Sequence, residues 1–155
     1  MASSPDVPDV APDAAETRAL YAGPLMQHAR APTRRGRVPE PTHEATGSNR
    51  PCGDRLSLTL EVNGDHIRAV RFDGEGCALS MASASLVCDH LEGQPLGCIE
   101  RLRTHVETAL ASDGSDADLP ESLRPLLAAR GFSSRHACVR LPLQVLSSAL
   151  HGEGG

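Results

Sequence analysis

Four residues with metal-binding side chains, Cys52, Asp54, Cys77 and Cys138, are the strongest chemical signal in the chain. Three thiolates and one carboxylate suit a tetrahedral zinc site. Gly53 allows a sharp turn between the first two, so that both side chains can reach one ion. A carboxylate in place of a fourth thiolate makes such a site more exchangeable than an all-thiolate structural site. We therefore hypothesise that the four side chains bind one zinc ion in a site that takes part in transfer chemistry.

The residues that separate Asp54 from Cys77 predict a β-hairpin. Residues 56–62 alternate apolar and polar side chains, which is the pattern of a half-buried strand. Asn63-Gly64 is the strongest short sequence signal for a hairpin turn, and residues 67–72 then return as the partner strand.

This hairpin positions three of the four candidate ligands. Cys52 and Asp54 lie just before its first strand, and Cys77 lies just after its second strand. Since antiparallel strands place these two ends side by side, the hairpin alone brings the three side chains together. Cys138 is not placed by this argument. Both Cys77 and Cys138 are predicted near the N-terminus of a helix, where the helix dipole favours a thiolate.

Helical spacing of apolar residues and a few breaker residues predict the other elements. We expect an α+β fold: a small antiparallel sheet of about three strands, with helices packed on one face and the metal at one exposed end. A short edge strand is predicted over residues 43–48. Helices are predicted over residues 17–30 with an interruption at Gly23-Pro24, over 80–91, 96–110 and 119–130, and from a cap at Ser133 or Ser134 to about Leu150.

Length and composition limit the class of protein. The 155 residues fit one domain, predicted over residues 17–150, with a disordered tail over residues 1–16 and a frayed tail over 151–155. A net charge of −5 gives no electrostatic case for nucleic acid. All fifteen basic residues are arginine, which excludes lysine chemistry such as a Schiff base. No apolar run is long enough to cross a membrane, and no secretory signal is present, so we expect a cytoplasmic protein. Five cysteines in such a chain favour metal or catalytic use over disulfides.

Two sequence motifs resemble a known family. Residues 49–54 (NRPCGD) and 72–85 (FDGEGCALSMASAS) are similar to the IscU/NifU-N family of iron–sulfur cluster assembly proteins. The resemblance covers roughly residues 20–150. The long interval between Cys77 and Cys138 is similar to the SufU-type branch. Two more residues resemble the SufU-type branch. Ala137 stands where the IscU branch has a histidine before its last cysteine, and Arg135 matches a basic position of the SufU pattern.

The resemblance implies a zinc-dependent sulfurtransferase. A PLP-dependent cysteine desulfurase, SufS-like, would make a persulfide, and a histidine of that partner would displace Cys52 from the zinc ion. Cys52 would then attack the persulfide as the catalytic residue, while Asp54, Cys77 and Cys138 keep the metal. Arg135 would orient the site or contact the desulfurase. The SUF scaffold complex or apoproteins would receive the sulfur downstream.

Two other functions remain open from the residues. The same ligands could hold iron or a [2Fe–2S] cluster, which would make the protein a scaffold that assembles a cluster and transfers it to apoproteins. The chain could also be a small zinc-stabilised binding domain without transfer chemistry. Cys88 and Cys98 are predicted to be structural thiols. His136 is predicted to point away from Cys138 and to face the surface or a partner.

Overall fold

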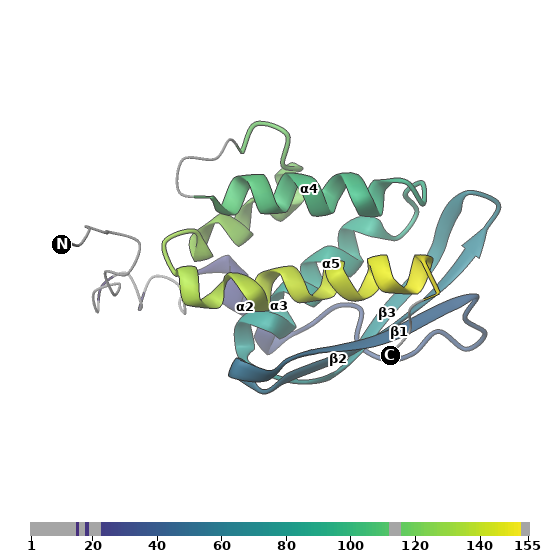
Figure 1. Ribbon diagram of the computed structural model, residues 1–155, viewed down its shortest axis with the longest axis horizontal. Helices are drawn as coiled ribbons and strands as arrows, with labels where there is room; N and C mark the ends of the chain where they lie inside the picture. The colour runs from purple at the N-terminus through teal and green to yellow at the C-terminus, as the bar shows by residue number, and fades with distance from the viewer. Residues whose placement is uncertain (1–14, 16–17, 19–22, 112–115, 153–155) are drawn as a thin grey trace.

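The computed structural model describes residues 15, 18, 23–111 and 116–152. Three antiparallel strands form one sheet in the order β1-β2-β3, which confirms the predicted sheet. The strands span β1 (His43–Asn49), β2 (Asp54–Asn63) and β3 (His66–Glu75). Figure 1 shows the helices gathered on one side of this sheet, as expected for the α+β fold.

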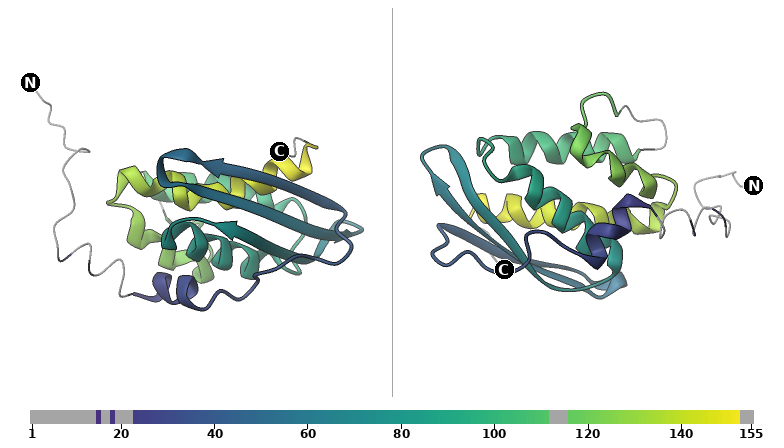
Figure 2. Two further views of the ribbon diagram at one scale, coloured as in Figure 1. Left: turned by 90° about the horizontal axis from the view of Figure 1, so that it is seen from below. Right: turned by 180° about the vertical axis from the view of Figure 1, so that it is seen from behind.

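The helices form layers over the sheet. In chain order they are α2 (Pro24–Arg30), η2 (Arg50–Cys52), α3 (Ala78–Leu91), α4 (Cys98–Leu110), η3 (Glu121–Ala129), η4 (Ser133–Arg135) and α5 (His136–Leu150). Helix α5 packs on β1 and β2, and α3 packs on β3. Helix α4 packs on the far side of α5 and forms an outer layer, whereas α2 packs beside α3 at the edge of the helical layer, as the two views in Figure 2 show.

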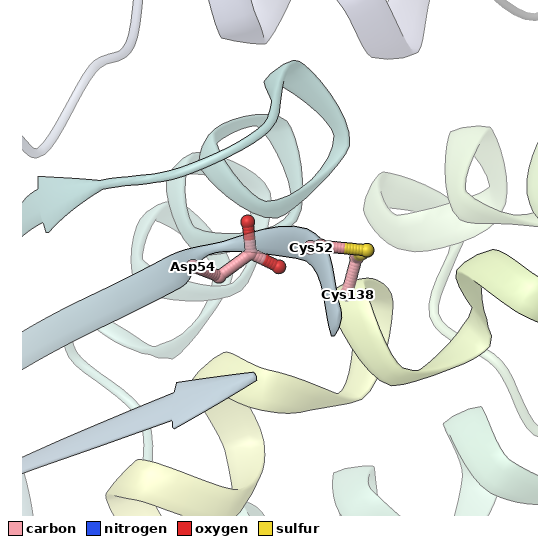
Figure 3. Close-up of side chains that lie close together, drawn as sticks. All are labelled: Cys52, Asp54 and Cys138. Atoms are coloured by element: carbon pink, nitrogen blue, oxygen red, sulfur yellow. The ribbon is translucent and has the colours of Figure 1, made fainter. Parts of the chain in front are cut away.

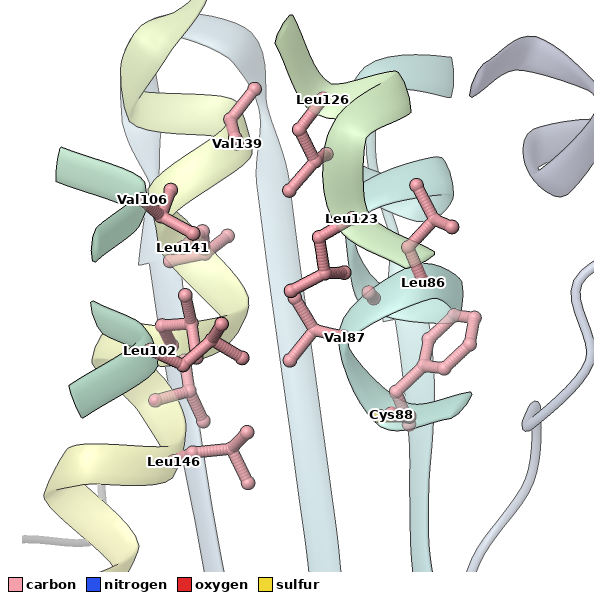
Figure 4. Packing of buried hydrophobic residues seen from close by; sticks show 14 of the residues in the cluster. Leu86, Val87, Cys88, Leu102, Val106, Leu123, Leu126, Val139, Leu141 and Leu146 are labelled. Carbon is pink, nitrogen blue, oxygen red and sulfur yellow. The ribbon is translucent and has the colours of Figure 1, made fainter. Parts of the chain in front are cut away.

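The core between the layers is aliphatic. Alternation along β2 directs Leu56, Leu58 and Leu60 toward the helices, and all three are fully buried. Figure 4 shows residues of α3, α4, η3 and α5 that fill the same core, among them Leu123 and Leu146. Phe72 is the only aromatic side chain among the described residues that are buried in the core, and leucine, valine and alanine make up most of that core.

The hairpin has the predicted turn but longer strands. Asn63 pairs with His66, and Gly64 in the turn has a φ of 67°, a conformation that glycine adopts without a steric penalty. The strands extend beyond the predicted ranges to Asp54 and Glu75, and Arg55 pairs with Glu75 at their far end. Asp54 is therefore the first residue of β2 and not a loop residue, so the sheet itself fixes its backbone.

Helix α3 packs closely against its neighbours because most of its residues are small. Alanine and serine occupy all of its faces, and every residue from Leu79 to Cys88 is buried. Ser83 Oγ donates a hydrogen bond of 2.7 Å to the carbonyl oxygen of Val139 on α5. This contact joins the helix that begins after Cys77 to the helix that carries Cys138.

Two helix predictions differ from the structure. The helix predicted over residues 119–130 is a 3₁₀ helix with Pro125 inside, where the missing N–H and the ring disfavour an α-helix. A 3₁₀ turn contains Ser133 and Ser134, and α5 begins after Arg135 without a side-chain cap, so the predicted serine cap is wrong. The structure agrees with the predicted interruption at Gly23-Pro24, because helix α2 begins there with Pro24 in its first turn.

Parts of the predicted organisation lie outside the described residues. These are the predicted tail over residues 1–16 except Ala15, most of the helix predicted before Gly23, and the last three residues. The domain bounds of 17–150 stay a prediction. Within the described residues, no helix is long and apolar enough to span a membrane.

Candidate metal centre

Cys52 and Asp54 lie where the chain enters β2. Residues 50–52 form the 3₁₀ turn η2, and Gly53 follows with a φ of 70°, which reverses the chain into the strand. Cys52 therefore ends the turn, and Asp54 begins β2 opposite Asn49, the last residue of β1. The Asp54 side chain is buried at 2% exposure, whereas Cys52 remains partly exposed.

Cys138 approaches these two residues from α5. It is the third residue of that helix and is fully buried. Its Sγ lies 3.1 Å from Cys52 Sγ, and both sulfur atoms and an Asp54 carboxylate oxygen lie within 4.8 Å of one another. Figure 3 shows the two sulfur atoms next to each other, with the carboxylate beside them. The structure thus places Cys138, which the hairpin argument could not position.

Cys77 borders this group without belonging to the three atoms that lie mutually within 4.8 Å. It is the N-cap of α3, and its Sγ accepts a hydrogen bond of 3.4 Å from the backbone N–H of Ser80. Its own backbone N–H donates to Asp54 Oδ1 at 2.7 Å. The two ends of the hairpin therefore meet as predicted, and they are joined directly through the Asp54 carboxylate.

Asn49 is a residue of this site that was not predicted from the sequence. Its Nδ2 donates to Asp54 Oδ2 at 3.2 Å and to Cys138 Sγ at 3.5 Å. Asn49 is part of the NRPCGD motif, but its function depends on the pairing of β1 with β2, which puts it opposite Asp54. The predicted edge strand over residues 43–48 was the signal that could have revealed it.

Burial and hydrogen bonds perturb two of the candidate ligands. Burial acts to raise the pKa of Asp54, but hydrogen bonds from Cys77, Cys138 and Asn49 outweigh it and hold this pKa below its ordinary value. Burial, with further contributions from Cys52 and Cys77, raises the pKa of the Cys138 thiol. In the protein without a metal, burial therefore opposes the effect that the helix N-terminus is expected to have on the Cys138 thiol.

The other sequence-predicted residues take separate places. Arg135 is the N-cap of α5, three residues before Cys138. His136 is half-buried, and its Nε2 contacts the carbonyl oxygens of Ala129 and Arg130 at 3.1 and 2.9 Å. Cys88 is fully buried in the core, and burial raises its pKa, as fits the predicted structural thiol.

The donor atoms fit a zinc ion. Two thiol sulfurs and a carboxylate oxygen converge, and a third thiol borders them, which gives the three-sulfur, one-oxygen set that a tetrahedral zinc site accepts. A carboxylate whose pKa is lowered is ionised at neutral pH and ready to bind a cation. Among the described residues, no other group of three or more His, Cys, Asp and Glu side chains has its ligand atoms this close together.

Solved structures share this fold. A NifU-like protein (N-terminal) from Brucella abortus superimposes with a TM-score of 0.79 at 20% identity, over 89% of this chain and 96% of that chain. A protein from Fervidobacterium islandicum AW-1, described as an iron–sulfur cluster assembly scaffold for the SUF system, gives a TM-score of 0.76 at 24% identity, over 86% and 98% of the two chains. The fold and the site thus define a class of small α+β domains with a cysteine–aspartate group at one end.

Sequence comparison identifies the family. Residues 20–124 match the model of the NifU-like N terminal domain. The zinc-dependent sulfurtransferase SufU of Bacillus subtilis is 31% identical over 147 residues, which cover 88% of this chain and 92% of that protein. The iron–sulfur cluster assembly scaffold protein IscU of Thermotoga maritima is 26% identical over 84% of this chain and 92% of that protein. The chain belongs to the NifU-like N-terminal domain family, and the predicted resemblance to its SufU-type members is confirmed.

Proposed function

We propose that this protein is a zinc-dependent sulfurtransferase that accepts persulfide sulfur through Cys52. The observation that carries the proposal is the difference in burial between two adjacent thiols. Cys138 and Asp54 are buried, whereas Cys52, 3.1 Å from Cys138, is partly exposed at the end of the sheet. A sulfur donor can therefore reach Cys52 while the buried ligands keep their places. The similarity to a protein named zinc-dependent sulfurtransferase supports the same assignment.

The four residues have distinct roles in this proposal. Cys52, Asp54, Cys77 and Cys138 would hold Zn²⁺, which when bound keeps thiols ionised at neutral pH. The Cys52 thiolate attacks the terminal sulfur of the donor persulfide, the donor's S–S bond breaks, and the donor cysteine leaves as a thiolate. Cys52 then carries the persulfide. Arg135, beside the site at the start of α5, would contact the sulfur donor.

The sulfur donor in this proposal is a PLP-dependent cysteine desulfurase of the SufS type. The product, a sulfane sulfur on Cys52, must be consumed by a reaction that builds iron–sulfur clusters, on a SUF scaffold complex or an apoprotein. The five cysteines are free thiols, and a reducing compartment keeps thiols from forming disulfides, so the cytoplasm is the proposed location.

A cluster scaffold is the second candidate function. Thiolates bind iron in [2Fe–2S] clusters as well as zinc, and the same three cysteines and Asp54 would be the ligands. The similarity to a protein named as an IscU scaffold favours this candidate. It predicts a coloured protein that can be reconstituted with iron and sulfide.

The deciding experiment measures metal content and desulfurase turnover together. Protein purified without added metal is expected to contain about one zinc per chain and to raise the turnover of a SUF-type cysteine desulfurase. Cys52→Ala is expected to abolish this stimulation. Cys98→Ala is the matched control, because Cys98 is a partly exposed thiol on α4 outside the group of metal-binding side chains. Bound iron and labile sulfide without stimulation would reject the sulfurtransferase in favour of the scaffold.

A further inference from the structure

Three of the four candidate ligands receive hydrogen bonds from N–H groups of the chain. Asp54 accepts from the backbone N–H of Cys77 and from the Asn49 side chain. Cys77 Sγ accepts from the backbone N–H of Ser80. Cys138 Sγ accepts from Asn49 at 3.5 Å, which is within the range of a bond to sulfur. These donors come from β1 and the start of α3, so the fold holds each of the three ligands from outside the metal group.

Cys52 differs from the other three. Within the described residues, its Sγ has one hydrogen-bond contact, and the donor is the Cys138 thiol. That proton is lost when both sulfur atoms bind a metal, because the thiolate is the ligand form. Cys52 is then the ligand without a hydrogen-bond donor from the surrounding protein.

Hydrogen bonds to ligands control how firmly a metal holds them. An N–H donor stabilises a thiolate or carboxylate in its ionised form and fixes its orientation, and loss of such a partner typically weakens metal binding by about 10- to 100-fold. A ligand that lacks this support exchanges more readily than its supported neighbours. Of two adjacent thiolates on one metal ion, the one without an N–H donor is therefore expected to dissociate from the metal first.

Asn49 creates this difference between the two sulfur atoms. We propose that Asn49 is a positioning residue that keeps Cys138 and Asp54 on the metal and thereby leaves Cys52 as the exchangeable thiolate. The inference rests on the metal binding of the proposed function but not on sulfur transfer. Asparagine suits the position because one amide nitrogen carries two N–H groups, one for the carboxylate and one for the sulfur. The end of β1 aims this nitrogen at both ligands through the pairing of Asn49 with Asp54.

The test follows each cysteine separately in the zinc-loaded protein. Iodoacetamide labelling is timed by peptide mass spectrometry, and zinc affinity is measured by competition with a chromophoric chelator. In the unmodified protein, Cys52 is expected to react at least about ten times faster than Cys138. Asn49→Ala is expected to raise the labelling rate of Cys138 about tenfold and to weaken zinc binding by about 10- to 100-fold, with the rate at Cys52 little changed.

Two further variants separate hydrogen bonding from packing. Asn49→Leu keeps the volume and branching of the side chain without its donors, so it is expected to behave like Asn49→Ala. Ser48→Ala changes the exposed neighbouring residue on β1 and is expected to behave like the unmodified protein. Circular dichroism shows which variants are folded. If Asn49→Ala is unfolded, the leucine variant decides.

Two results would overturn the inference. One is labelling of Cys138 as fast as Cys52 in the unmodified protein, which needs no variant. The other is a folded Asn49→Leu protein with unchanged labelling and zinc affinity, which would assign Asn49 a packing role. Failure of the sulfurtransferase proposal gives a different result. A Cys52→Ala protein that still stimulates the desulfurase would reject sulfur transfer, but it would not change the labelling rates measured in the unmodified and Asn49 variant proteins.

Discussion

At the scale of single residues, the site depends on how closely backbone and side chains approach at Asp54. Gly76 faces this side chain, and a Cβ placed on Gly76 would lie 2.5 Å from Asp54 Oδ1 and 3.0 Å from Asp54 Cα. No side chain fits in that space without displacing the carboxylate. The glycine before Cys77 is therefore needed for contact with a ligand and not for an unusual backbone angle.

We expect Gly76→Ala to weaken zinc binding by about tenfold or more, because the new methyl group pushes Asp54 away from its hydrogen bonds with Cys77 and Asn49. Chelator competition measures the affinity. Gly131→Ala is the control, since a Cβ there meets nothing within 4 Å. Unchanged affinity in a folded Gly76→Ala protein would show that Asp54 is not held as a metal ligand.

At the scale of elements, one carboxylate joins the end of α3 to the sheet and to the segment that precedes β1 in the chain. Glu92, the C-cap of α3, accepts hydrogen bonds from the Val70 N–H at 3.1 Å and from Arg71 at 2.6 Å. It also forms an ion pair with Arg34 at 3.3 Å. Because α3 carries Cys77 at its other end, this group of contacts holds the helix that supports the site.

Glu92 also makes stability depend on pH. Burial acts to raise its pKa, but hydrogen bonds from Arg71 and Val70 outweigh it and hold the pKa below the ordinary value of 4.5. A pKa lowered by folding means that the unfolded state binds the proton more tightly. The stabilisation is therefore complete above pH 4.5 and is lost as the pH falls through the lower folded-state pKa.

Glu92→Gln is expected to cost about 1 to 3 kcal/mol of unfolding free energy at pH 7, because two arginines lose their charged partner. Urea unfolding from pH 7 down to pH 3 should show this difference shrinking below pH 4.5. Glu121→Gln, at an exposed carboxylate on η3, should have little effect at any pH. If the difference in unfolding free energy between Glu92→Gln and the unmodified protein stays constant with pH, the ionised carboxylate is not the cause of that difference.

At the scale of the whole molecule, the candidate metal centre joins segments that are far apart in the sequence. Asp54 begins β2, Cys77 precedes α3 and Cys138 lies in α5. Outside this centre, α5 packs against β2 and α3 in the core, and the bond between Ser83 and Val139 joins α3 to α5. An ion bound by all of them would stabilise the native state only, since the unfolded chain does not hold the ligands together.

Zinc is therefore expected to raise the thermal midpoint. At a free zinc concentration 100 times the dissociation constant, the gain is about 2.7 kcal/mol, or about 5 to 10 °C for a domain of this size. Differential scanning calorimetry with zinc and with a chelator measures the shift. Cys138→Ser should reduce the shift strongly, because it removes a buried ligand. An equal shift in the Cys138→Ser protein would argue that zinc stabilises the fold elsewhere.

The sequence by itself determined the β-hairpin and the meeting of three candidate ligands at its open end. The alternation over residues 56–62 and the Asn63-Gly64 turn are local signals, and a hairpin makes its two ends adjacent whatever surrounds it. That geometry brought Cys52, Asp54 and Cys77 to one place before any fold was known. The two cysteine motifs identified the family for the same reason, since each lies within one short segment.

Only the tertiary structure decided which residues complete the site. Cys138 reaches Cys52 because α5 packs across β1 and β2, and Asn49 faces Asp54 because β1 pairs with β2. Neither contact follows from local periodicity, because each depends on how separate elements pack. The serine cap and the α-helix over residues 119–130 failed for the related reason that packing and Pro125 overrode local propensity. Burial of Cys138, which raises the pKa of its thiol, also depends on the whole fold, because several elements pack around this side chain.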